Sequence, residues 1–164
     1  MKNVTIIVFL LAAFGMVGCG PRKNTALSRN YQAFITRYNI YYNGDEHYKI
    51  TMKDLENTYV DDYSRLLFVH PTDARGVEGV TQPQGDFTRS IEKAQKAIQL
   101  RSIKKKPARK AGKSSDPKYK EWMRREEYNP FLHNAWMMLG KSQFNNGDFL
   151  GAASTFYYIS KHFS

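Results

Sequence analysis

Residues 136–156 read WMMLGKSQFNNGDFLGAASTF, and this stretch decides the fold. It holds an Asn-Gly turn signal at 146–147 between two segments whose apolar residues recur at helical spacing. Small and large side chains on the facing sides of these segments come from five positions: Trp136, Leu139, Gly140, Ala152 and Phe156. Gly140 and Ala152 are small enough for two antiparallel helices to approach closely, and the three larger side chains fill the space around the crossing. The stretch therefore predicts a helical hairpin.

The pattern Trp-x2-Leu-Gly, followed by Ala-x3-Phe, resembles the tetratricopeptide repeat, a pair of antiparallel helices that stacks on its neighbours. The alternative interpretation is a helical hairpin that belongs to no repeat family. No segment shows the apolar–polar alternation of a strand, so the sequence predicts an all-α fold. We expect antiparallel helix pairs of tetratricopeptide type, arranged as a short α-solenoid fragment.

Earlier segments also predict helices. Apolar residues at steps of four, three, four and three form one stripe: Leu27, Tyr31, Phe34, Tyr38 and Tyr41. This stripe predicts a helix that ends at Asn43-Gly44. A second helix is expected over 48–67, stopped by Pro71, and a loop over 70–85 follows because Gly and Pro are frequent there. Asp86 is expected to cap a third helix. The predicted buried face of that helix consists of Phe87, Ile91, Ala94 and Ile98.

The first residues have the features of an export and lipid-attachment signal. Residues 4–17 follow Lys2, are apolar apart from Thr5, and are fewer than the roughly 20 that a membrane-spanning helix needs. Met16-Val17-Gly18-Cys19 resembles the lipobox of bacterial lipoproteins, in which the cysteine thiol is alkylated by diacylglycerol. Cys19 is the single cysteine of the chain, which excludes an intramolecular disulfide. The alternative is a buried free cysteine in an N-terminal helix; we expect a lipid anchor, whose acyl chains hold the protein on a membrane.

These features divide the chain into five parts. We predict a lipoprotein signal peptide over 1–18, a tether over 19–26, a degenerate helical-repeat region over 27–100, a basic linker over 101–116, and a helix with one repeat-like hairpin over 117–164.

The chain is strongly basic, with 25 Lys and Arg against 15 Asp and Glu and a net charge of +10. Residues 101–113 hold seven basic residues and no acidic one, and Pro107 and Gly112 interrupt any helical period. We expect this segment to be solvated and to lack a packed face. Such charge favours an anionic membrane surface, an acidic polymer or nucleic acid as a partner. Because the chain carries an export signal, we expect no nucleic acid partner.

A wider resemblance covers nearly all of the chain after the signal. It rests on KNTALSRNYQAFITRYNIYYNGDEHYK (23–49), VDDYS (60–64), IEKAQKAIQ (91–99) and MLGKSQF (138–144). These segments resemble the N-terminal part of tetratricopeptide lipoproteins of Bacteroidota, which include gliding-motility and type IX secretion lipoproteins. The resemblance implies an outer-membrane lipoprotein whose repeats bind other envelope proteins and scaffold a secretion or envelope assembly, without catalysis. Residues 20–23 lack the acidic cluster associated with surface export in that group, so we expect the protein to face the periplasm.

No motif indicates catalysis, a cofactor or a metal. The four histidines are scattered, and the sequence has neither a nucleophile elbow nor a Gly-rich phosphate loop. Asp61 and Asp62 are adjacent, and neighbouring residues of a helix do not face each other. We therefore expect a non-catalytic scaffold without a cofactor. The alternative function is a cationic lipoprotein that binds a cell-wall or envelope polymer through 101–113.

The last predicted helix, over 149–163, leaves apolar side chains without a partner. Its hairpin partner covers Ala152, Phe156 and Ile159, which leaves three residues on other sides: Ala153, Tyr157 and Phe163. A stack of repeats needs a further helix there. We expect these residues to form an open docking surface, either because a longer parental protein is cut short here or because a partner supplies the next helix.

The lipid anchor can be tested in cells. The Cys19→Ala variant should accumulate as an unprocessed precursor and should take up no fatty-acid analogue, because the thiol that receives the lipid is missing. Metabolic labelling followed by gel analysis measures both effects. Continued labelling of the variant would show that the lipid is attached at another residue, and Cys19 would not be the anchor.

Overall fold

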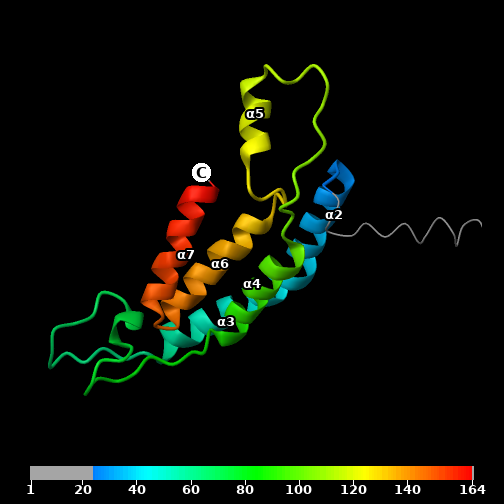
Figure 1. Ribbon diagram of the computed structural model, residues 1–164. Helices are drawn as coiled ribbons and strands as arrows, with labels where there is room; N and C mark the ends of the chain where they lie inside the picture. Colours follow the sequence, from blue (N-terminus) through cyan, green and yellow to red (C-terminus); the bar gives the residue numbers. More distant parts are fainter. Residues whose placement is uncertain (1–23, 164) are drawn as a thin grey trace, which may run out of the picture.

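The computed structural model describes residues 24–163, and all regular structure in that range is helical (Figure 1). The α-helices are α2 (Ala26–Ile35), α3 (Tyr42–Thr58), α4 (Thr88–Arg101), α5 (Pro117–Arg124), α6 (Leu132–Asn145) and α7 (Phe149–His162). A π-helical segment, η1 (Thr36–Tyr41), joins α2 to α3, and a short 3-10 helix, η2 (Pro71–Ala74), precedes α4. The predicted all-α class is confirmed for these residues. The predicted signal peptide, Cys19 and Ser164 lie outside them.

Helix α6 lies at the centre of the packing. It contacts α4 and α7, and α4 also packs against α3 and η1. The core between these helices is made of small and medium apolar side chains: Ile40, Ala94, Ala97, Leu132, Ala135, Met138 and Leu139. Helix α5 stands apart from the other helices at the end of a long excursion between α4 and α6 (Figure 1).

Gly44 lies inside a continuous helix instead of ending one. Helix α2, η1 and α3 follow one another without a break, so the predicted helix end at Asn43-Gly44 is wrong. Gly44 is buried, and a Cβ atom added to it would lie 2.7 Å from Met138 Cε and 2.9 Å from Lys93 Cβ. Its carbonyl oxygen accepts a hydrogen bond from Ser90 Oγ at 3.1 Å. The glycine therefore serves the close approach of three helices, α3, α4 and α6.

The buried face of the first helix is mostly polar and recurs at intervals of four residues: Ser28, Gln32, Thr36, Ile40 and Gly44. An α-helix has 3.6 residues per turn, so a series with this interval would rotate steadily away from the core. A π-helix has about 4.4 residues per turn and rotates the series back. The π-helical segment η1 thereby keeps one face of the whole helix toward α4.

The aromatic stripe of the first helix faces solvent. Leu27, Tyr31, Phe34 and Tyr38 are between 49 % and 70 % exposed, and Tyr41 is half-buried. The polar face of the helix takes the core side instead.

Hydrogen bonds hold the polar face inside. Gln32 Oε1 accepts a hydrogen bond from Arg101 Nη1 at 3.2 Å, and Thr36 Oγ1 accepts one from Asn129 Nδ2 at 3.1 Å. Asn129 Nδ2 also donates to the Arg101 carbonyl at 2.9 Å. A buried polar group without a partner costs about 1–3 kcal/mol. These bonds offset that cost and fix which face of α2 points to the core.

Helix α3 ends at Thr58, nine residues before the predicted end at Leu67. Tyr59 is extended, and Asp62 begins a turn in which its Oδ1 accepts from the Ser64 amide at 3.0 Å. Pro71 does not stop a helix but begins η2, where the ring nitrogen of His70 accepts from the Thr72 amide at 3.2 Å. The predicted loop over 70–85 is otherwise irregular, and α4 begins at Thr88, whose amide donates to Asp86 Oδ1 at 2.8 Å.

The segment expected to lack any packed residue has one that is fully buried. Ile103 has no exposed surface, and its amide donates to Glu127 Oε1 at 2.8 Å. The same oxygen accepts from the amides of Tyr128 and Asn129 at 3.0 and 2.7 Å. Residues 104–115 are almost all exposed, as expected from their charge. The Glu127 carboxylate thus holds the two ends of the segment between α4 and α6 together. The basic residues between these ends remain exposed.

The close approach at Gly44 predicts a specific loss of stability. Replacing Gly44 by Ala should lower the free energy of unfolding by about 1–3 kcal/mol, because the added methyl group would overlap Met138 and Lys93. Alanine has the higher helix propensity, so the loss would come from packing alone. Urea unfolding measures it.

The matched control is the neighbouring residue of the same dipeptide. Asn43 is exposed, and Asn43→Ala should change stability by less than about 0.5 kcal/mol. A Gly44→Ala variant as stable as its parent would rule out the close contact.

Candidate functional site

The hairpin of α6 and α7 brings the predicted signature residues together. The chain turns at Gly147, whose φ of 89° favours glycine, and Asp148 Oδ1 accepts from the Gly151 amide at 2.9 Å to begin α7. A Cβ atom on Gly140 would lie 2.7 Å from Phe156 Cε1. Gly140 therefore has the role that the sequence predicted, which is to let the aromatic ring of the facing helix approach its backbone.

The other signature positions line the same crossing. Leu139 and Ala152 are buried, and the Trp136 ring stacks on Tyr158 with a centroid distance of 4.3 Å. Trp136 also packs against the core between α4 and α6. These residues hold the hairpin to its neighbours, so their role is structural.

The predicted docking surface is only partly one surface. Ala153 and Tyr157 are exposed on α7, and Leu150 extends the same side of the helix. Lys161 Nζ lies 4.7 Å from the centre of the Tyr157 ring. Phe163 instead is half-buried, and its ring lies 6.3 Å from those of His133 and Tyr158. The expectation that Phe163 shares a surface with Tyr157 is therefore wrong, because the chain end folds back toward the start of α6.

A groove that the sequence did not indicate lies between α3 and α6. It encloses about 150 Å³, and its lining combines apolar and polar side chains: Tyr41, Asp45, Tyr48, Asn134, Met137, Met138 and Lys141. Met137 is 38 % exposed although it lies on the central helix. The groove thus combines two methionine side chains with polar groups, and its lining carries charges of both signs, those of Asp45 and Lys141.

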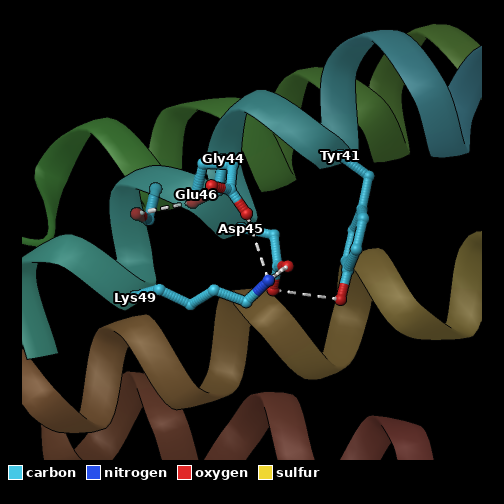
Figure 2. A network of polar contacts seen from close by, with 6 residues as sticks. Tyr41, Gly44, Asp45, Glu46 and Lys49 are labelled. Carbon is cyan, nitrogen blue, oxygen red and sulfur yellow. Dashed lines mark hydrogen bonds and ion pairs between the residues drawn. The ribbon is translucent and has the colours of Figure 1, made fainter.

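A polar network forms the α3 side of this groove (Figure 2). Lys49 Nζ lies 2.8 Å from Asp45 Oδ2 and 3.1 Å from Glu46 Oε1, and the Tyr41 hydroxyl donates to Asp45 Oδ1 at 3.4 Å. Burial raises the pKa of the Tyr41 phenol, and the nearby Asp45 charge raises it further. Hydrogen bonds to Asp45 and Glu46 raise the pKa of Lys49. At neutral pH the Tyr41 phenol is therefore neutral and the Lys49 amino group is protonated.

Asn145 holds Tyr48, one of the residues that line the groove, in place. Its Nδ2 donates to the Tyr48 hydroxyl at 3.0 Å, and its Oδ1 accepts from Thr72 Oγ1 at 3.1 Å. Burial raises the pKa of Tyr48. Since Asn145 ends α6 and Thr72 belongs to η2, these bonds tie the loop after α3 to the end of the central helix.

A second hollow lies between α2, α5 and the end of α7, with a volume of about 480 Å³. Its walls include the Arg29 guanidinium, which lies 5.1 Å from the centre of the Trp122 ring, and His162, whose Nδ1 lies 3.2 Å from Glu126 Oε2. The hollow is lined by residues from both ends of the described chain, so sequence spacing could not indicate it.

The described residues show no feature of a metal centre or of a membrane span. No group of three or more His, Cys, Asp or Glu side chains in residues 24–163 is placed to hold a metal ion. Within the same range, no helix is both long and apolar enough to cross a bilayer. His47 lies near two hydroxyl groups, those of Ser90 at 3.3 Å and Thr51 at 3.4 Å.

One charge pair beside the groove has a signal in the sequence. Asp45 and Lys49 are four residues apart, a spacing that pairs opposite charges on a helix. The aromatic partners Tyr41 and Tyr48 come next to α6 only because α3 continues through Gly44. No protein-family model matches the chain, and no curated protein matches its sequence.

The contact between Gly140 and Phe156 can be tested with a double-mutant cycle. Gly140→Ala alone should destabilise the protein by about 1–3 kcal/mol, because the new methyl group would overlap the ring. In a Phe156→Leu background the same change should cost less, and the coupling energy should exceed about 0.5 kcal/mol. Thermal and urea unfolding of the four proteins give this energy. Additive effects would show that the two residues do not meet.

Proposed function

We propose that this protein is a membrane-anchored, non-catalytic scaffold that binds other cell-envelope proteins through helical repeats of tetratricopeptide type. The proposal is supported by the order of the helices. Two antiparallel pairs, α3 with α4 and α6 with α7, lie next to each other, and α6 contacts a helix of the preceding pair as well as its own partner. Stacked repeats have this order of neighbours.

The observation that carries the proposal is the groove between α3 and α6, the first helices of the two pairs. The partly exposed Met137 side chain lies in it, and its lining includes Lys141 and Asp45, which pairs with Lys49. A peptide segment with one large apolar side chain and a polar flank fits this chemistry.

The sequence supports the proposed cellular location of the protein. Cys19, which ends the lipobox-like segment, is the residue to which acyl chains are attached. The resemblance to Bacteroidota lipoproteins favours the outer membrane and the periplasmic side. In that setting the protein serves as a component of a secretion or gliding assembly, and the exposed side of α7 around Tyr157 receives a further helix.

Site-specific photo-crosslinking tests the scaffold. A photoreactive amino acid in place of Met137, in the groove, should form discrete adducts with a second envelope protein in intact cells. The same amino acid in place of Gln95, which is exposed on α4, should form none. Adding Lys141→Glu should reduce the Met137 adducts, because it reverses a charge at the edge of the groove. Equal adducts from both positions, or none from Met137, would contradict partner binding in the groove.

A further inference from the structure

The first helix carries an uncovered apolar face that the proposed groove does not use. Five large side chains recur along it at steps of four, three, four and four: Leu27, Tyr31, Phe34, Tyr38 and Tyr42. Each is at least 49 % exposed, and the rings of Phe34 and Tyr38 lie 4.9 Å apart. The opposite, polar face is held inside by the hydrogen bonds of Gln32 and Thr36, so this face cannot turn inward without breaking them.

The part of the first helix that carries this aromatic face holds charge of one sign. Residues 24–44 contain two arginines, Arg29 and Arg37, and no acidic residue. The Arg37 guanidinium lies 5.1 Å from the centre of the Tyr38 ring, within the aromatic face itself. Acidic residues begin only at Asp45, beyond the end of the face.

A cationic hollow lies beside the start of the same helix. It has a volume of about 410 Å³ and is lined by five basic residues and no acidic one; the basic residues are Lys106, Arg109, Lys110, Lys120 and Arg124. Two contacts tie this region to the first turn of α2. Asn24 Nδ2 donates to the Lys105 carbonyl at 2.6 Å, and the Arg29 guanidinium lies 5.1 Å from the centre of the Trp122 ring of α5. We call these five residues the basic hollow.

We propose that the aromatic face of α2 and η1 docks on the surface of an anionic lipid bilayer, with the basic hollow receiving headgroup phosphates. Tyrosine and phenylalanine on one side of a helix favour the membrane interface, and basic residues are attracted to anionic lipid. Six residues separate Cys19 from Ala26, a span of at most about 25 Å, so an acyl anchor on Cys19 keeps the face within reach of the bilayer. The inference rests on the membrane anchoring proposed above.

A fluorescent probe in reconstituted vesicles tests the docking. The full chain is purified from membranes and reconstituted in vesicles of phosphatidylcholine with brominated acyl chains, with and without phosphatidylglycerol. An environment-sensitive fluorescent amino acid replaces either Phe34, in the aromatic face, or Tyr157, an equally exposed aromatic residue of α7. Flotation of the vesicles reports whether residues 1–23 anchor the chain, and quenching by bromine reports whether the probe enters the bilayer.

We expect the probe at position 34 to be quenched and the probe at 157 to remain in water. Quenching at 34 should be stronger with phosphatidylglycerol, and Lys106→Glu with Lys110→Glu should weaken the docked population roughly tenfold. Tyr31→Ser with Tyr38→Ser should abolish quenching at 34 while leaving the melting temperature unchanged, since both residues are exposed.

The alternatives give different results. A chain that floats with position 34 unquenched would overturn the docking and leave the proposed anchoring intact, whereas a chain that does not float would overturn both. A spectral shift at 34 that grows with protein concentration in the absence of vesicles would assign the face to a second copy of the chain. Binding of an acidic polysaccharide without quenching at 34 would assign the basic hollow to an envelope polymer. Either result would overturn the bilayer as the occupant.

Discussion

Two close contacts at glycines hold α6 between its neighbours, and the rest of the helical arrangement depends on them. On one side, Met138 of α6 lies against the backbone of α3 at Gly44, and on the other, Gly140 of α6 receives the ring of Phe156 from α7. A side chain at either glycine would force the helices apart, because interiors are packed too densely to absorb an added carbon without rearrangement. Met138 also belongs to the groove lining, so the contact at Gly44 sets the depth of the groove between α3 and α6.

The orientation of α2 follows a different rule from that of the other helices. Its core side is chosen by hydrogen bonds to Arg101 and Asn129 and not by the burial of its largest side chains. Burying the aromatic face instead would remove more apolar surface from water. It would also turn Gln32 and Thr36 toward solvent and break their hydrogen bonds with Arg101 and Asn129. The π-helical segment allows the polar face to stay toward the core along the whole helix, because it keeps residues spaced by four on one side.

The hairpin was predictable from the sequence because every signal for it is local. The Asn-Gly turn, the small residues Gly140 and Ala152, and the large residues around them lie within one short stretch, and the structure uses each of them there. The first helix was predictable as a helix but not in its orientation. Periodicity identifies an apolar face without saying what covers it, and the decisive partner, Asn129, lies 93 residues from Thr36 in the sequence. The same limit applies to Gly44. The sequence alone does not distinguish a glycine that ends a helix from one that lets a neighbouring helix approach.

The outward faces of the first and last described helices carry the surfaces that we propose for membrane docking and for a further helix. Helices α2 and α7 lie on opposite sides of α4 and α6 (Figure 1). If α2 rests on a bilayer, the exposed side of α7 around Leu150 and Tyr157 points away from it, and the groove remains open beside α3. A further helix that stacks on α7 would then extend the packed helices away from the membrane, since each new pair in a stack of helical repeats contacts only the pair before it. Docking at the start of the chain and partner binding further along it therefore do not compete for the same surface.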